Sequence, residues 1–282
     1  MKIIIGAANF SKNYGLSNSK ISSIKNLKKI LSYCKKENIN IIDDAFSYGN
    51  NSRVFKKINT RDFKFISKIK LPKNYKLIKN LELYFLDIIK KSLKLLGKKQ
   101  YSYLLAHEVN DHKKNIHLLN ILNFLKKKKL TKKIGVSVYN PKEMYSVLKL
   151  SKLDVVQIPF NIFDTRLVDS KLINILIKKK IEIHVRSIFL QGALLSSKIP
   201  NKLKKYKVDL QDWQKWCHKK KLNKVKACVH FVKKIDKISS IIVGVNNVKQ
   251  LREIIKFLKE KTIDISYKNR LIKSDIIDPR KW

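Results

Sequence analysis

Four side chains suited to proton transfer follow the ends of three predicted strands. Asp43 and Tyr48 lie in the stretch IIDDAFSYGN, Ile41–Asn50, where a β-branched run breaks into a loop. Lys68 lies in the apolar segment FISKIK, and His107 follows the apolar run of LLAHEVND. A phenol with an ordinary pKa near ~10 needs charged neighbours before it can act as an acid at neutral pH. The set therefore indicates an acid-base site with Tyr48 as the proton donor.

Each of the four residues also has a purely structural explanation. Asp43 fits a strand-to-loop turn with Asp as a helix cap, and a histidine at a strand end is often structural. However, a lysine buried in a strand needs a carboxylate partner, and Asp43 on the neighbouring strand can supply one. In the resulting mechanism Asp43 balances Lys68, and Lys68 lowers the pKa of Tyr48. His107 then orients a carbonyl oxygen.

The elements that must position these residues alternate along the chain between short apolar strands and helices with apolar residues at a helical period. The predicted strands are Lys2–Ile5, Ile39–Asp43, Phe63–Ile69, Tyr101–His107, Lys133–Val138, Val155–Pro159, Ile181–Val185 and Ser239–Val243. The predicted helices include Lys20–Lys36, Ser52–Ile58, Leu77–Leu96, Asn115–Lys128, one opening at Asn140-Pro141, Ser170–Lys179 and Val248–Lys261.

Eight strand–helix repeats in this length predict an α/β fold, a closed (β/α)8 TIM barrel that forms a single domain over residues 1–282. A doubly wound open sheet is the second candidate. It is disfavoured because the sequence after the first strand, GAANFSKNYG, lacks the GxGxxG pattern of that fold.

In a barrel, the residues that follow the strands share the face that holds the active site. Ser137, Gln157, Arg186 and Ser187 follow the fifth to seventh strands and join the four residues above. Four of the seven glycines also fall just past strand ends, where they permit close approach of a ligand to the backbone. They are Gly6, Gly49, Gly192 and Gly244.

One long segment, Gln191–Leu222, interrupts the repeat between the seventh strand and its helix, and we expect it to cover the barrel mouth. Its Trp213 and Trp216 have the spacing of a helix face that packs on the barrel. The tail, Ser266–Trp282, is expected to reach the same rim. Four aromatic residues are candidates for the substrate pocket or, equally, for the core: Phe46, Phe160, Phe189 and Trp213.

The net charge of +43 raises the question of a nucleic-acid partner, because clustered cations release counterions from phosphates. Here the lysines are spread over nearly every predicted helix, and only seven of the 64 basic residues are arginine, the usual side chain for base contacts. We therefore expect no specific nucleic-acid site. The positive field would still attract anions, including a pyrophosphate cofactor.

The remaining composition indicates a reducing compartment. The cysteines Cys34, Cys217 and Cys228 are odd in number and lack the CxxC spacing of a metal site, so neither a disulfide framework nor a bound metal is expected. No run of about 18 apolar residues is present, and no secretion signal is recognisable. The sequence thus predicts a cytoplasmic protein without a membrane segment, monomeric or weakly homo-oligomeric.

The motifs together resemble those of the aldo-keto reductase superfamily, in its bacterial type, over nearly the whole chain. The early pattern of the family is matched by Gly6–Phe10 and Tyr14-Gly15. Its DTA-x-x-YG motif is matched by Asp43–Gly49, with Asp44 in place of the usual threonine. The family lysine and histidine fall on Lys68 and His107. The GVS motif is Gly135–Ser137, the family glutamine is Gln157, and RSIFLQG, Arg186–Gly192, resembles the turn after the seventh strand.

The resemblance implies a nicotinamide cofactor, NADP or NAD, bound across the barrel mouth. It implies hydride transfer to an aldehyde or ketone, sugar-derived carbonyls included, with Asp43, Tyr48, Lys68 and His107 as the catalytic residues. Ser137 and Gln157 would hold the carboxamide, and the segment Gly244–Glu253 the adenosine end. The implied cofactor-binding residues are Ser137, Gln157, Arg186, Ser187, Phe189, Gln191, Gly192, Gly244, Asn246, Asn247, Gln250 and Glu253.

The chain departs from the family pattern at several of these positions. Val138 replaces a common asparagine, and Arg186 stands where many members place an aromatic residue that stacks on the nicotinamide. Arg186 is therefore a candidate for contact with a phosphate or a substrate carboxylate instead. The Lys and Arg that many members use for the 2′-phosphate fall at Gly244 and Gln250, which weakens the expectation of NADP over NAD, although Lys249 lies nearby.

Two other classes of function remain open at this stage. One is a non-catalytic family member that serves as a regulatory or scaffolding subunit, and all four catalytic side chains argue against it. The other is a basic nucleic-acid-binding protein, which rests on charge alone. The expected partner is a small carbonyl compound.

Overall fold

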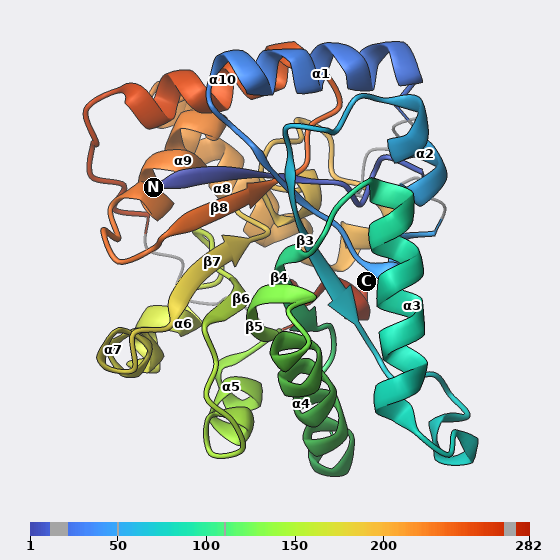
Figure 1. Ribbon diagram of the computed structural model, residues 1–282. Helices are drawn as coiled ribbons and strands as arrows, with labels where there is room; N and C mark the ends of the chain where they lie inside the picture. The colour runs from blue at the N-terminus through green and yellow to red at the C-terminus, as the bar shows by residue number, and fades with distance from the viewer. Residues whose placement is uncertain (12–21, 50, 110, 268–274) are drawn as a thin grey trace.

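The computed structural model describes residues 1–11, 22–49, 51–109, 111–267 and 275–282 (Figure 1). In these ranges eight parallel strands close a barrel in sequence order, which confirms the predicted TIM barrel. The strands are β1 (Lys2–Gly6), β2 (Ile41–Asp43), β3 (Lys64–Ile69), β4 (Tyr101–Ala106), β5 (Thr131–Ser137), β6 (Val155–Pro159), β7 (Glu182–Arg186) and β8 (Ser240–Val243).

Helices surround the barrel and cover its outer surface (Figure 1). They are α1 (Ile24–Lys36), α2 (Asn51–Lys57), α3 (Leu81–Leu96), α4 (His112–Lys127), α5 (Pro141–Leu148), α6 (Arg166–Asp169), α7 (Leu172–Lys178), α8 (Lys207–Lys219), α9 (Lys224–Lys233) and α10 (Val248–Lys259). Short 3-10 turns occur at Phe46–Tyr48, Tyr75–Leu77, Leu190–Gly192, Asn201–Tyr206 and Pro279–Lys281.

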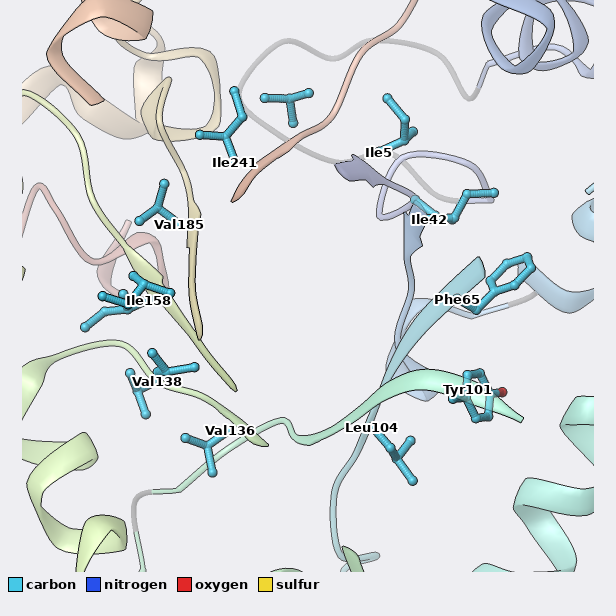
Figure 2. Close-up of a cluster of buried hydrophobic side chains, with 14 of the residues drawn as sticks. Ile5, Ile42, Phe65, Tyr101, Leu104, Val136, Val138, Ile158, Val185 and Ile241 are labelled. Atoms are coloured by element: carbon cyan, nitrogen blue, oxygen red, sulfur yellow. The ribbon is translucent and has the colours of Figure 1, made fainter. Parts of the chain in front are cut away.

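The alternation of side chains along each strand divides the core into two layers. One apolar cluster combines side chains from five strands: Ile4, Ile66, Leu105, Val155 and Ile242. Their neighbours in sequence belong to a second, larger cluster that includes buried residues of the helices, as Ile5, Phe65 and Leu104 illustrate. Figure 2 shows this second set around the ring of strands. Burial of both faces explains why the strands read as continuous apolar runs.

Local signals place the helix boundaries. The side chains of Asn80, Asp111 and Asn140 accept bonds from the backbone N–H three residues later, at the starts of α3, α4 and α5. Ser23 caps α1 in the same way, so the helix predicted from Lys20 begins at Ile24. The helix predicted over Ser170–Lys179 is shorter and begins at Leu172 as α7, because Lys171 before it has a left-handed backbone with φ of 58°, and the short α6 ends at Asp169.

The segment after β7 and the described end of the tail share a separate apolar cluster. Its centre is Trp213 of α8, which is fully buried, stacks on Trp216 with ring centroids 5.6 Å apart, and donates its indole N–H to the Leu194 carbonyl. Ile276 and Ile277 of the tail join the cluster. Trp213 is thus a packing residue, as its helical spacing with Trp216 predicted.

Candidate active site at the barrel mouth

A buried ion pair lies at the carboxyl ends of β2 and β3. Lys68 Nζ donates to Asp43 Oδ2 at 2.6 Å, and the two side chains are only 2% and 5% exposed. Gln157, in the middle of β6, donates its amide to the other carboxylate oxygen at 2.6 Å. The carboxylate therefore has a charged partner and a neutral one, which offsets the desolvation of the pair.

Tyr48 reaches the same place through the 3-10 turn that follows β2. The turn is closed by the bond from Tyr48 N to the Ala45 carbonyl, and Gly49 leaves it with a positive φ of 86°. The ammonium of Lys68 lies 5.3 Å from the centre of the Tyr48 ring and also donates to the Asp44 carbonyl at 3.0 Å. A single ammonium thus contacts both the carboxylate and the phenol ring.

His107 completes the group from the residue after β4. Its ring is edge-on to Tyr48, with centroids 5.9 Å apart, and its Nδ1 lies 3.1 Å from Ser47 Oγ. The backbone N–H of His107 continues the sheet ladder to the Ile69 carbonyl, which fixes the position of the ring. The structure therefore brings together all four residues predicted to be catalytic.

The pKa of Tyr48 differs from the sequence prediction. Burial of the phenol raises its pKa well above the usual range, Asp43 raises it further, and the guanidinium of Arg186 opposes both. The net pKa is therefore raised, not lowered as the sequence predicted, because burial outweighs the influence of nearby cations.

Asp44, which stands where the family motif has threonine, makes a different set of contacts. Asn51 donates to Asp44 Oδ1 at 2.6 Å and also to the Ala7 carbonyl, so that it links α2 to the loop after β1. Burial raises the pKa of Asp44 to about 6. The structure therefore holds a second carboxyl group beside the ion pair, with a pKa close to neutral.

A cavity of about 480 Å³ opens beside these residues and has Asp43 and Tyr48 in its lining. The loop after β7 forms one side of it, and the loop after β8 with the start of α10 forms another. The predicted cofactor-binding residues that line this cavity are Arg186, Ser187, Phe189, Gln191, Gly192, Gly244, Asn246, Gln250 and Glu253.

Three other predicted cofactor-binding residues do not line the cavity. Ser137 and Gln157 are buried and are paired in register on β5 and β6. Asn247 caps α10 by accepting the Gln250 N–H. Of the predicted pocket aromatics, only Phe189 lines the cavity, whereas Phe160 and Trp213 are core residues and Phe46 is exposed.

The loop after β7 has an unusual backbone that explains how it lines the cavity. Ser187, Leu190 and Gln191 all have positive φ, and Gly192 follows with a φ of 94° that side chains rarely adopt. The predicted match Tyr14-Gly15 lies outside the described residues.

Two buried acceptors indicate where the donor group of a ligand would fit: Asn9 Oδ1, from the cavity lining, and Gln157 Oε1, whose amide nitrogen bonds Asp43 of that lining. Neither oxygen has a hydrogen-bond partner among the described residues. Buried acceptors are rarely left in this state without a ligand or water. A carboxamide NH2 is the complementary donor for Gln157 Oε1, so the residues present fit a nicotinamide at this place.

Sequence reasoning missed several residues of the site. Asn9, after β1, lines the cavity and donates to the Val245 carbonyl and to Asn246 Oδ1, which joins the loops after β1 and β8. Its position after a strand end was the available signal. The Tyr139 ring also contacts the guanidinium groups of Arg186 and Arg280. No local sequence pattern indicates these contacts.

The described residues contain no group of three or more histidine, cysteine, aspartate or glutamate side chains arranged to hold a metal ion. No helix within the same ranges has the length and apolar character needed to cross a membrane.

Comparison with known proteins places this barrel and its polar mouth in one family. The sequence profile of the aldo/keto reductase family matches residues 2–273. The chain therefore belongs to the aldo/keto reductase family, whose members are generally NAD(P)H-dependent oxidoreductases. A search of curated protein sequences gave no match.

Solved structures show the same fold. An aldo-keto reductase from Bacillus halodurans, in its holo form, has a TM-score of 0.73 and 14% identity, covering 93% of this chain and 88% of that chain. A glycerol dehydrogenase from Gluconobacter oxydans has a TM-score of 0.69 and 17% identity, covering 93% of this chain and 87% of that chain. At these identities the likeness concerns the fold alone.

Proposed function

We propose that this chain reduces aldehydes or ketones, sugar-derived carbonyls among them, with a nicotinamide cofactor and with Tyr48 as the proton donor. The observation that carries the proposal is the meeting of Tyr48 and His107 with the buried Lys68–Asp43 pair beside the cavity. Proton transfer from a positioned side chain requires this kind of grouping.

Residues in the cavity lining and directly behind it are suited to hold the cofactor. Gln157 Oε1 and Ser137 would bind the carboxamide, the loop Ser187–Gly192 the central part, and Asn246, Gln250 and Glu253 the adenosine end. A reduced nicotinamide, NADPH or NADH, supplies a hydride when bound there. The protein contributes position and electrostatics to this chemistry.

Tyr48 and its neighbours carry the proton-transfer half of the reaction. A raised pKa keeps the phenol protonated at neutral pH, so that a proton is present to give. The alkoxide formed at the carbonyl oxygen is a stronger base than a phenolate and takes this proton from Tyr48. The phenolate that remains gains from the nearby Lys68 ammonium and recovers its proton from water. His107 orients the carbonyl oxygen by hydrogen bonding.

Replacement of Tyr48 by phenylalanine tests the proposal. We expect Tyr48→Phe to lower carbonyl reduction by at least roughly a hundredfold, because general acid catalysis contributes about 10²–10⁴. The turnover of a panel of aldehydes is followed by NADPH or NADH absorbance, and cofactor binding by protein fluorescence. Binding should be nearly unchanged, since the ring is retained.

Tyr84→Phe is the matched control, because Tyr84 lies on the exposed side of α3. Retention of wild-type turnover in Tyr48→Phe would remove Tyr48 from the role of acid. If the wild-type protein binds the cofactor but reduces no carbonyl in the panel, the regulatory or scaffolding alternative replaces the proposal.

A further inference from the structure

Arg186 occupies a part of the cavity that the proposed reaction does not explain. It ends β7, lines the cavity together with Tyr48, and its guanidinium lies over the Tyr139 ring at 4.4 Å. One donor, Nη2, bonds the Val138 carbonyl at 2.9 Å. Nε is buried and has no hydrogen-bond partner among the described residues. A guanidinium has five N–H donors, so most of this one's donors are not accounted for by the protein.

The neighbouring arginines show what is missing at Arg186. Arg166 donates to the Tyr139 carbonyl and binds both oxygens of Asp164 at 2.8 Å. Arg280 lies over the Tyr139 ring at 3.8 Å and binds both oxygens of Asp278. Each of these two guanidinium groups therefore has its own bidentate carboxylate.

Arg186 has no such partner. No ion pair joins it to any Asp or Glu of the described ranges, and the remaining segments, 12–21, 50, 110 and 268–274, contain neither residue type. A partly buried cation without a counter-ion is unfavourable, and its planar fork matches a carboxylate or phosphate. This is the charge arrangement of a site that an anionic ligand completes.

The position of the guanidinium is fixed before any ligand binds. Tyr139, on which it stacks, donates its backbone N–H to Glu143 at 2.6 Å and carries Arg280 over its ring. The bond to Val138 fixes the guanidinium from the side. Because little side-chain freedom remains, an anion bound here gains affinity with a small ordering cost.

The position of the Arg186 guanidinium would also place a bound anion in the same cavity as the Tyr48 phenol. Arg186 and Tyr48 line one cavity, and the guanidinium opposes the burial effect on the pKa of the phenol, so the two groups interact electrostatically. A cation beside a nicotinamide ring that becomes positive on oxidation is unfavourable unless an anion compensates it. A substrate that carries both the carbonyl and an anionic group would satisfy Arg186 and Tyr48 together.

We propose that Arg186 binds an anionic oxygen group of the substrate, so that the enzyme prefers small carbonyl compounds bearing a carboxylate or a phosphate. This inference rests on the proposed reductase function and narrows its substrate class. It assigns Arg186 to the substrate, where the family resemblance implied the cofactor.

Pairs of substrates that differ only in charge test the assignment. Succinic semialdehyde is compared with its methyl ester, and glyceraldehyde 3-phosphate with glyceraldehyde. In the wild type we expect kcat/KM to be at least about tenfold higher for one or both anionic members, as charge-assisted bonds imply. Arg186→Gln should reduce that ratio to about one, by raising KM for the anionic member much more than for the uncharged member.

Two further variants separate charge from folding. Arg186→Lys keeps the charge without the fork and should recover part of the ratio. Arg61→Gln removes an exposed arginine outside the cavity and should leave the ratio unchanged. Thermal melts of each variant identify any loss of folding. If Arg186→Gln is unfolded, the kcat/KM ratio of Arg186→Lys is compared with that of the wild type instead.

Binding without catalysis distinguishes this inference from the proposed function. Succinate and dimethyl succinate are titrated into wild type and Arg186→Gln by calorimetry, without cofactor. Succinate binding that is lost in Arg186→Gln supports the anion site even if no carbonyl is reduced. Equal reduction of the charged and uncharged members in both pairs by the wild type overturns the inference while the reductase function stands. A loss of cofactor affinity in Arg186→Gln, with both substrates affected alike, would return Arg186 to the cofactor and also overturn it.

Discussion

At the scale of single residues, the site depends on how a buried charge is shared. Lys68 contacts the Asp43 carboxylate, the Asp44 carbonyl and the face of the Tyr48 ring. In the resting state its charge is balanced by Asp43, and the phenol keeps its proton. In the proposed reaction, the phenolate left after proton transfer has the same ammonium as a neighbour. The role we propose for Lys68 therefore concerns the charged product of proton transfer more than the resting phenol.

The carboxyl of Asp44 gives a prediction on the pH dependence of stability. Its pKa is about 6 in the folded protein and 3.8 in an ordinary environment, so the folded state binds protons more tightly. Stability is then fully present below about pH 4 and decreases as the pH rises through 6. Asp44→Asn keeps an acceptor for Asn51 and removes the charge. We expect it to stabilise the protein by about 1–2 kcal/mol at pH 7.5, allowing for partial exposure, and by almost nothing near pH 4.

Urea unfolding of both proteins across pH 4 to 8 measures this difference. Asp87→Asn is the control, because Asp87 is exposed on α3 and pairs with the exposed Lys91. A stabilisation of the same size at both ends of the pH range would contradict the assignment, since it would not arise from titration of Asp44.

At the scale of elements, we expect the start of α10 to determine the choice between NADPH and NADH. Gln250 lines the cavity and accepts the Asn246 N–H at 2.8 Å, so its amide is held at the expected position of the 2′-phosphate. It can donate hydrogen bonds but brings no charge, whereas an arginine would meet the phosphate with a planar fork. We predict a wild-type preference for NADPH of less than about a hundredfold and a clear gain for NADPH in Gln250→Arg.

Titration of each cofactor by tyrosine and tryptophan fluorescence checks this prediction. Arg252→Gln serves as a control for charge on the same helix, because Arg252 lies over the Tyr33 ring and is absent from the cavity lining. A wild-type preference above roughly a thousandfold would mean that surrounding lysines bind the 2′-phosphate, and the Gln250 argument would then fail.

Most elements of the fold, and part of the site, could be predicted from the sequence. The apolar period and the caps locate the strands and most helices, and residues at strand ends necessarily share one rim, so Asp43, Lys68 and His107 could be grouped from sequence. The sequence could not predict the break between α6 and α7 or the left-handed backbone of Ser187 and Gln191. Non-glycine residues adopt positive φ only when packing requires it.

At the scale of the whole molecule, the missed features are those that join distant parts of the chain. Arg166 and Arg280 each bind a carboxylate two residues earlier in the chain, whereas Arg186 has no such partner among the described residues. Arg186 and Arg280 contact the same Tyr139 ring only because the tail returns to the loop after β5. The pKa of Tyr48 likewise depends on the complete packing around the ring, which desolvates the phenol.

The net charge of +43 also belongs to the whole molecule, and it leads to a last prediction. Exposed lysines occur on α1 (Lys28/Lys29), on α3 (Lys90/Lys91) and at the end of α7 and just after it (Lys178–Lys180), and these three helices lie on different sides of the barrel (Figure 1). Charge spread in this way cannot follow one groove of a duplex. We expect only weak binding to DNA at about 0.15 M salt, with Kd near 10⁻⁶–10⁻⁴ M and no sequence preference.

Fluorescence anisotropy with two unrelated duplexes, each measured over a salt series, checks this expectation. For a purely electrostatic contact, log K falls linearly with log salt and has the same slope for both sequences. Cofactor added to saturation should leave DNA binding unchanged, because the exposed lysines named above are absent from the cavity lining. Nanomolar binding to one duplex at the same salt would contradict the prediction and would make nucleic acid a specific partner. Equal, salt-sensitive binding instead confines the role of the charge to attracting small anions to the mouth, where Arg186 and the loop after β7 line the cavity.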